Sequence, residues 1–230
     1  PVPGATPPPA GAAPPADPPS PALDAFFAHY YARRPVTATF TGVHAHDAAL
    51  PDWSPTGLAA LDDEMRRLHA ELGAAHPLPD DPAGAAATRA LAADGRVLDA
   101  ELARCFLEIQ RAELAGGHGP RGNPALWTGE AIFALVALMT RDFAPLAERV
   151  RLATARLLAT PRFLADAAST LADALPTPWT ARALRECAAA AMLLDVGVAR
   201  WLASAPVDPA DAAALREAAR VAAAAFARLA

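Results

Sequence analysis

Two histidines and two carboxylates lie close together between His44 and Asp52, and side chains of these types hold divalent metals. Imidazole nitrogens and carboxylate oxygens are ligands that zinc uses in proteins. In a strand, the spacing of His44 and His46 would place both rings on one face. The alternative is a surface loop whose short polar side chains cap a turn. We expect the loop, with no metal site in this chain, and keep His44, His46 and Asp47 as the candidate ligands should a metal bind.

Several other kinds of catalysis are excluded by residue type or by spacing. All 20 basic residues are arginines, so lysine Schiff bases and phosphate-loop lysines are impossible. The run Gly117–Gly122 matches the glycine pattern of dinucleotide-binding proteins, but it follows a predicted helix and not a strand, which indicates a helix stop. Neither an H-E-x-x-H nor a G-x-S-x-G motif occurs. We therefore expect no catalytic residue and no cofactor within this chain.

Charge and hydropathy exclude two classes of partner. The formal net charge is −5 at pH 7, whereas nucleic-acid binding needs a basic face. No apolar run reaches the length of about 18 residues that a membrane span requires, so no membrane span is expected. Cys105 and Cys187 lie within apolar helical patterns, which favours two buried free thiols over a disulfide.

Helix starts are marked seven times by a capping residue followed directly by proline. The capping side chain accepts a hydrogen bond from an unpaired backbone N–H, and proline at the first helical position loses none. An eighth start is predicted at Asp142, with Pro145 in the first turn. The seven pairs are Ser20-Pro21, Ser54-Pro55, Asp81-Pro82, Asn123-Pro124, Thr160-Pro161, Thr177-Pro178 and Asp208-Pro209.

Between these starts, apolar residues recur at helical spacing, which predicts an all-α fold of about eight helices in a compact bundle. The segment Leu126–Met139 is apolar nearly all round and is expected at the centre. Val36–Val43 is rich in β-branched residues but has no pairing partner, so we expect an extended connector. The predicted buried stripes are Leu91, Leu98, Leu102, Cys105 and Ile109; Leu146, Val150, Ala153 and Leu157; Leu184, Ala188, Ala191, Leu194, Val198 and Trp201; and Leu215, Ala219, Ala222, Phe226 and Leu229.

The first 19 residues consist almost entirely of proline, alanine and glycine. Such a segment cannot bury apolar surface, so residues 1–19 are predicted to be a disordered leader and residues 20–230 one helical domain. A tether of this composition commonly follows an export signal or a lipid anchor. This favours an exported or cell-envelope protein, with a plain disordered N-terminus as the alternative.

Two residues beside the histidine segment carry structural expectations. Trp53 directly precedes the Ser54 cap, from where an apolar ring can pack onto Leu58 in the first helical turns. Its functional alternative is to line a cleft beside His44 and His46. Gly42 is expected where a side chain is unwelcome.

The segment Tyr31–Asp47, with Leu50–Ser54 after it, resembles the opening of a bacterial family named domain of unknown function 885. The similarity extends from residue 20 to about residue 205 and includes the Asn123-Pro124 helix start, residues 156–164 and the turn at Thr177. The matching residues of the opening are Pro35, Ala38, Thr39, Gly42, His44, Asp47, Leu50, Asp52 and Ser54.

The resemblance implies a mostly helical protein much longer than this chain, similar to gluzincin-type metallopeptidases. The implied zinc-binding helix lies in the C-terminal half, after Ala230, so no zinc ligand transfers to a residue of this sequence. This chain would then be the non-catalytic N-terminal helical domain, walling or covering the cleft, with the C-terminal half as its partner. The alternatives are a stand-alone helical binding or scaffold domain, and a small metalloenzyme built on His44, His46 and Asp47.

Overall fold

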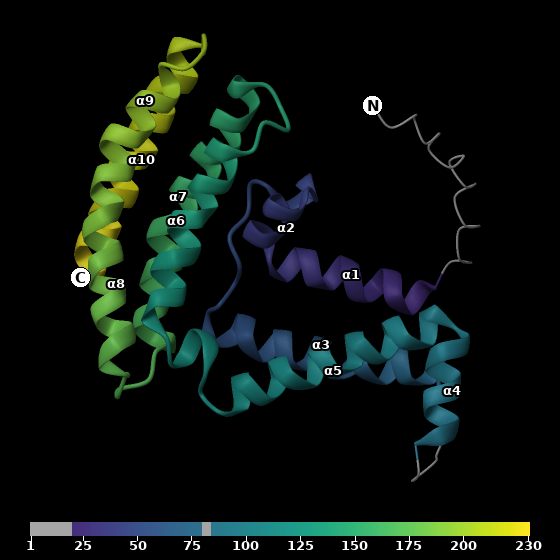
Figure 1. Ribbon diagram of the computed structural model, residues 1–230. Helices are drawn as coiled ribbons and strands as arrows, with labels where there is room; N and C mark the ends of the chain where they lie inside the picture. The colour runs from purple at the N-terminus through teal and green to yellow at the C-terminus, as the bar shows by residue number, and fades with distance from the viewer. Residues whose placement is uncertain (1–19, 80–83) are drawn as a thin grey trace, which may run out of the picture.

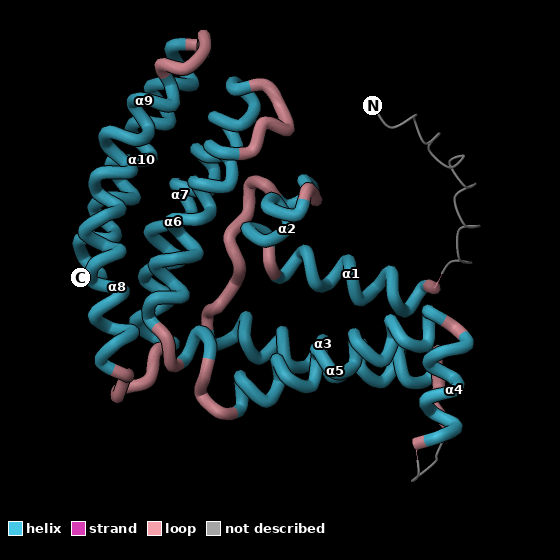
Figure 2. Tube along the Cα trace, in the orientation of Figure 1, coloured by secondary structure: helices cyan, strands magenta, loops and turns pink. Residues whose placement is uncertain are grey.

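The computed structural model describes residues 20–79 and 84–230, and these residues form helices and no strands (Figures 1 and 2). The predicted leader and the predicted helix start at Asp81-Pro82 lie outside the described residues. The all-α prediction is confirmed. The helices are α1 (Pro21–Arg33), α2 (Pro35–Thr41), α3 (Pro55–Ala75), α4 (Ala85–Ala93), α5 (Gly95–Ala115), α6 (Pro124–Thr140), α7 (Leu146–Thr170), α8 (Thr177–Met192), α9 (Val198–Leu202) and α10 (Pro209–Leu229).

Three short segments complete the fold. The 3₁₀ turns η1 (His44–His46) and η2 (Gly119–Arg121) lie in loops, and the π-helical segment η3 (Leu193–Gly197) joins α8 to α9. With α8, η3 and α9 taken as one continuous helix, the described residues form nine helices, close to the predicted eight. Within the described ranges, no helix is both long and apolar enough to cross a membrane.

The helices divide into two packed groups that meet at a corner (Figure 1). The first group, here called the arm, contains α1, α3, α4 and α5, and its core includes Phe26, Met65 and Leu107. The second group, the bundle, contains α6 to α10, with a core that includes Trp127, Val150 and Phe226. The short helix α2 contacts both α1 and α6, and therefore sits where the two groups meet.

Proline-marked helix starts are confirmed at Pro21, Pro55, Pro124 and Pro209, and α8 starts at Thr177, one residue before the predicted Pro178. The side chains of Ser54, Asn123 and Asp208 accept the capping hydrogen bonds, as expected.

The predicted starts at Asp142 and Thr160-Pro161 are wrong, because α7 begins at Leu146 and continues through Pro161. Proline lacks the N–H that would donate to the Leu157 carbonyl, four residues earlier, but the helix continues without this bond to Thr170. The buried face also continues from Leu157 to Leu164 across the proline. Packing on both sides of Pro161 therefore outweighs its local cost.

The expected extended connector at Val36–Val43 is also wrong, because Pro35–Thr41 forms helix α2. Its buried side contains Val36, Ala38 and Thr39, which pack towards α6. Tertiary burial here overrides β-propensity. Gly42 ends the helix at φ +90°, and apart from its chain neighbours no atom lies within 4 Å of the place that a Cβ would occupy. A side chain is therefore unwelcome at Gly42 for its left-handed backbone and not for lack of space.

Two of the predicted stripes face the wrong way. On α5 the buried residues are Ala100, Ala103 and Leu107, whereas Leu102 and Ile109 of the predicted stripe are 60% and 58% exposed. The period was right but the phase was wrong, because α5 is apolar on two faces and small alanines allow closer approach to α3. On α8 the buried set is Ala183, Cys187 and Ala190, one residue before the predicted one, although Leu194, Val198 and Trp201 are buried as expected.

The stripes on α7 and α10 are confirmed, and α6 packs against α2, α7 and α8 at the centre, as expected. Both cysteines are free, as predicted. Cys187 is buried, but Cys105 is exposed, because it lies on the outward face of α5. The prediction of two buried thiols is therefore wrong for Cys105.

Candidate functional site

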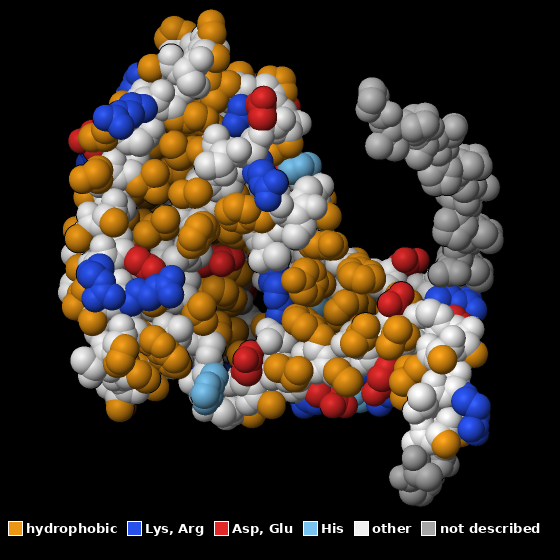
Figure 3. All heavy atoms as spheres, viewed as in Figure 1, with side chains coloured by type: hydrophobic (Ala, Val, Ile, Leu, Met, Phe, Trp, Pro, Cys, Tyr) orange, Lys and Arg blue, Asp and Glu red, His pale blue; other side chains and the backbone are white. Residues whose placement is uncertain are grey.

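A cavity of about 230 Å³ lies at the corner between the arm and the bundle, and we call it the junction pocket. Figure 3 shows the surface hollowed there, with charged and hydrophobic side chains at its edge. The pocket is built from several segments that are distant in sequence. Its lining is Arg34, Thr37, Trp53, Leu61, Met65, Gln110, Glu113, Leu114, His118, Gly119, Pro120, Leu126 and Glu130.

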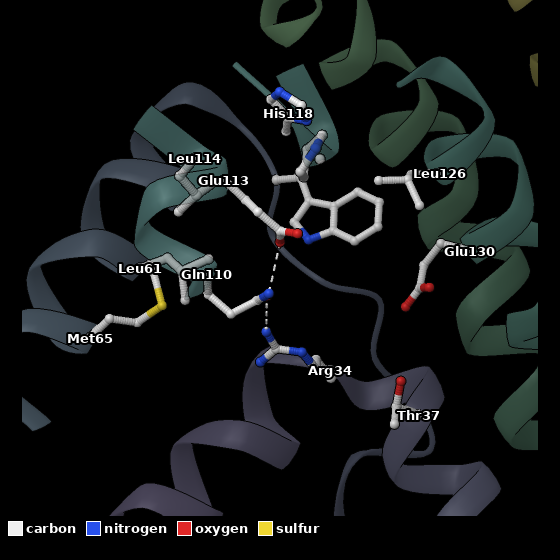
Figure 4. A pocket seen from close by; sticks show the side chains of 13 residues that line it. Arg34, Thr37, Leu61, Met65, Gln110, Glu113, Leu114, His118, Leu126 and Glu130 are labelled. Carbon is white, nitrogen blue, oxygen red and sulfur yellow. Dashed lines mark hydrogen bonds between the residues drawn. The ribbon is translucent and has the colours of Figure 1, made fainter. Parts of the chain in front are cut away.

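One side of the junction pocket is a hydrogen-bonded row of three polar side chains (Figure 4). Arg34 follows α1 directly and donates from its terminal nitrogen to Gln110 Oε1 at 2.6 Å. Gln110 in turn donates to Glu113 Oε2 at 2.8 Å. The guanidinium also lies 4.9 Å from the ring centres of Tyr30 and Phe106. The charge of Arg34 is therefore held by an amide and by two aromatic faces.

Across the cavity, Glu130 points inward from α6 (Figure 4). Burial raises the pKa of this carboxyl group from 4.5 to about 7, although Arg156 and Arg34 act in the opposite direction. The carboxylate accepts no hydrogen bond from another described residue, so those two charges act only at longer range. Glu130 is therefore a largely buried acid whose hydrogen-bonding capacity is unused.

Trp53 forms part of the wall, and its ring packs against the core of the bundle. Its ring lies 5.3 Å from Trp127 and 5.4 Å from Phe163, between ring centres. Its carbonyl accepts a hydrogen bond from the Thr170 hydroxyl at 3.1 Å. The ring is thus fixed by α6 and α7, while one part of it lines the pocket. The ring therefore packs on the bundle and also lines a cavity, but His44 and His46, beside which the functional alternative placed it, are not in the lining.

The loop from α5 to α6 closes one end of the pocket. Gly117 ends α5 in the left-handed region at φ +69°, and His118 N–H donates to the Glu113 carbonyl at 2.9 Å. This pattern is a glycine-terminated helix stop, as the sequence predicted. Trp127 Nε1 donates to the Pro120 carbonyl at 2.8 Å and ties the loop to α6.

The sequence-predicted histidine segment follows α2 and contacts it, and the structure brings together only part of it. His44 Nδ1 lies 2.8 Å from Asp47 Oδ2, and the Thr39 hydroxyl donates to Asp47 Oδ1 at 2.5 Å. The His44 ring stacks on Phe143 with 3.8 Å between ring centres. His46 contributes its backbone carbonyl, 3.5 Å from the Arg156 guanidinium. No side-chain partner joins His46 to the pair.

No group of three or more His, Cys, Asp or Glu side chains in the described residues could hold a metal ion. Asp52, the fourth residue of the segment, accepts a hydrogen bond from the Ser54 hydroxyl at 2.6 Å in a turn. A catalytic zinc needs about three protein ligands. The described residues therefore do not fit the zinc that the family resemblance implies.

Arg156, between the histidine segment and α6, is a fully buried side chain, and all three of its guanidinium nitrogens donate hydrogen bonds. Its Nε donates to the Ala49 carbonyl at 3.1 Å, and its two terminal nitrogens reach Ala134 and Pro35 carbonyls at 2.8 and 3.0 Å. It also donates to the Thr39 hydroxyl at 2.7 Å. Burial lowers the pKa of Arg156 to about 10. This residue ties three segments of the chain together.

Sequence reasoning missed Arg34, Gln110 and Glu130. Arg34 and Gln110 carry no local signal, because their meeting depends on how the arm packs. Glu130 does carry one, since it is the sole charged residue between Pro124 and Thr140. An isolated acid in an apolar central helix is a candidate for a shifted pKa and hence for a site.

Two comparisons relate the chain to known proteins, and a third finds no match. Residues 35–230 match the profile of a family described as bacterial protein of unknown function, DUF885. A solved structure of similar fold is a putative lipoprotein of unknown function from Shewanella oneidensis, with 17% sequence identity and a TM-score of 0.73. The alignment covers 90% of this chain and 35% of that chain. The search of curated proteins found no match.

At that identity the Shewanella protein supports the fold alone, and this chain spans about a third of its length. The family match covers most of the chain, since it includes α2, the histidine segment, every helix of the bundle and all of the pocket lining except Arg34. The chain therefore belongs to the DUF885 family of bacterial proteins.

Proposed function

We propose that this chain is the non-catalytic N-terminal helical part of a longer protein that resembles zinc-dependent metallopeptidases. In this proposal, the corner between the arm and the bundle walls or covers the active-site cleft. The observation that carries it is the junction pocket, where an unpaired acid and an apolar wall meet at that corner. Pockets that combine apolar walls with a few polar groups are characteristic of ligand sites.

Three further parts of the proposal concern the partner of this chain, the zinc ligands and the cellular location. The similar solved chain extends far beyond the aligned third, and we propose that its counterpart in this protein is the C-terminal half, the partner of this chain. Because the described residues lack a metal-ligand cluster, zinc would be held by that half. We also propose an exported or cell-envelope location, in keeping with the lipoprotein description of the structural neighbour.

The test uses the whole protein encoded by the gene, beside the 230-residue chain. A mixture of short peptides is incubated with each, and hydrolysis is measured as the release of new amino groups. We expect hydrolysis by the whole protein and none by the chain alone. Hydrolysis by the chain alone would contradict the non-catalytic assignment, and an inactive, zinc-loaded whole protein would favour the binding-domain alternative.

A pair of leucine variants tests whether the pocket faces the cleft. Leu126, 38% exposed, lines the pocket, whereas Leu184 on α8 is 46% exposed and does not. In the whole protein, Leu126→Trp should lower kcat/KM about tenfold or more by filling the pocket, with unchanged zinc content. Leu184→Trp should leave kcat/KM unchanged. Equal activity of the two variants would show that the pocket is not part of the cleft.

A further inference from the structure

We propose that the junction pocket binds an organic ammonium group on a small apolar body, with Glu130 as its anionic partner. This inference deepens the proposed function, because it names what the corner would recognise. Its test needs only the 230-residue chain, so its failure can be told apart from failure of the proposed cleft.

The hydrogen-bonding state of the pocket indicates which charge is missing. Three charged side chains face the cavity: Arg34, Glu113 and Glu130. Arg34 donates to Gln110 and lies over two aromatic rings, and Glu113 accepts from Gln110. Of these three side chains, only the Glu130 carboxylate forms no hydrogen bond with the described residues. A carboxylate has two oxygens that accept hydrogen bonds, so the unused capacity is for a donor.

Charge selects a cation among the possible donors and acceptors. Two carboxylates and one guanidinium line the cavity, so an anion would meet more negative than positive charge. A divalent metal ion is also disfavoured, because no three ligand side chains are grouped here and Ca²⁺ needs about six oxygen ligands. An ammonium group needs fewer partners, since it offers three donors on one compact centre.

The position of Thr37 gives the ammonium group a second acceptor. Figure 4 shows Thr37 of α2 on the same side of the cavity as Glu130. A hydroxyl oxygen accepts hydrogen bonds as well as donating them. A group that lies between α2 and α6 could therefore donate to both side chains at once.

The rest of the wall fixes the size and polarity of the ligand. The volume of about 230 Å³ is below the range of about 300–1,000 Å³ typical of drug-sized ligands. Leu61, Met65, Leu114 and Leu126 supply hydrocarbon surface, and Trp53 supplies an aromatic one. The pocket therefore suits a body as large as one amino-acid side chain. Such an ammonium group occurs on a free small amine and on the lysine side chain or amino terminus of a peptide.

The electrostatics of Glu130 support this assignment. Burial disfavours its charged form and raises its pKa to about 7. A cation bound beside it would favour the ionised carboxylate and recover part of the energy lost on burial. Neither Arg34, which is tied to Gln110, nor Arg156, which is tied to backbone carbonyls, makes that contact in the free chain.

The experiment is an NMR titration of the 230-residue chain with three probes of one shape: phenethylamine, 2-phenylethanol and 3-phenylpropanoate. The chain has four tryptophans, and Trp53 is the one in the pocket lining, so its indole N–H signal, assigned with Trp53→Phe, reports binding. We expect phenethylamine to shift this signal and to bind about tenfold or more tightly than the alcohol, because a hydrogen bond to a charged group is added.

Matched variants locate the contact. Glu130→Gln keeps the shape of the side chain and should weaken phenethylamine binding about tenfold, with no change for the alcohol. Glu148→Gln, an exposed acid on α7, should change neither affinity, and circular dichroism confirms that both variants are folded. Equal binding of amine and alcohol, unchanged affinity in Glu130→Gln, or tighter binding of 3-phenylpropanoate would each overturn the proposal.

Two peptide arms identify the source of the ammonium group. One short peptide carries a lysine and an acetylated amino terminus, and the other has a free amino terminus and no lysine. Displacement of phenethylamine by either one supports the ammonium proposal and assigns a peptide source. Binding of phenethylamine without displacement by either peptide supports a free amine. A doubly blocked peptide that competes as well as these two would contradict recognition of the charge.

Discussion

Arg156, which is fully buried, and Glu130, which is partly buried, are two ionisable side chains beside the same stretch of α6, and their hydrogen bonding is opposite. Arg156 donates to the carbonyls of Ala49, Ala134 and Pro35, so nearly all of its donors are used. The carboxylate of Glu130, one helical turn before Ala134, accepts no hydrogen bond from a described residue. A buried charge with a full set of partners fixes the segments around it, whereas one without partners retains capacity for a ligand.

Removal of Arg156 should produce the largest effect. Arg156→Met removes a donor from each of the three carbonyls and from the Thr39 hydroxyl, so we expect a loss of about 3–5 kcal/mol in the free energy of unfolding. Urea denaturation measures it. Arg162→Met, on the same helix with a side chain 87% exposed, should stay within about 0.5 kcal/mol of wild type. A loss below about 1 kcal/mol for Arg156→Met would break the comparison, since Arg156 would then be no more structural than a surface residue.

Trp53 lines the junction pocket and also packs against the core of the bundle, and its truncation should give the next largest effect. Truncation to alanine removes its contacts with Trp127 and Phe163. Because the ring is only partly buried, we expect a loss of about 2–4 kcal/mol, somewhat below that for a fully buried tryptophan. Leu158→Ala, at a position 60% exposed, serves as the control. A Trp53→Ala loss as small as that of the control would mean that the ring serves the pocket alone.

The sequence predicts the starts of the helices better than it predicts how the helices pack. Helix starts at Ser54-Pro55 or Asn123-Pro124 depend on neighbouring residues, so local chemistry determines them. The phase of α5 depends on which of two apolar faces meets α3, and α7 crosses Pro161 because residues on both sides are buried. Neither outcome is encoded within a few residues.

The candidate site shows the same limit. Arg34, Gln110 and Glu130 come from three separate segments, and their distance in space depends on the angle between arm and bundle. The residues of the histidine segment are close in sequence, yet only the side chains of His44 and Asp47 contact each other. Glu130 alone could have been identified beforehand, as the one charge in an apolar helix.

The pH dependence of stability sharpens the comparison at Glu130. Its pKa is raised in the folded state from 4.5 to about 7, so between these values the folded chain binds more protons than the unfolded chain. Stability contributed by this group is therefore present below pH 4.5 and is lost as the pH rises through 7, by up to about 3 kcal/mol. Glu130→Gln should remove this decline, so that the variant is the more stable one at pH 8.

Urea unfolding at pH 5 and pH 8 measures that difference, with Glu148→Gln as the control. Other acids act in the opposite direction. Although burial opposes the shift, hydrogen bonds from Arg111 and Arg33 lower the pKa values of Asp62 and Glu64. The stability that these two acids contribute is therefore lost at low pH. They are shared by all the variants and cancel. If wild type and Glu130→Gln change equally between the two pH values, Glu130 is not a buried ionisable group.

The smallest effects are expected at His44 and His46. Both lie near Arg156, and the two variants test which of their side chains contributes to stability there. His44→Ala loses the hydrogen bond to Asp47 and the stacking on Phe143, which should cost about 1 kcal/mol. His46 takes part through its backbone carbonyl, which alanine retains, so His46→Ala should stay within about 0.5 kcal/mol of wild type.

Elemental analysis after equilibration with zinc should give far less than one zinc per chain for wild type and both variants, because the pair of His44 and Asp47 lacks a third ligand. One tightly held zinc that is lost in both variants would revive the metalloenzyme hypothesis for this loop. It would also mean that the contact between His44 and Asp47, to which we assign a structural role, belongs to a binding site.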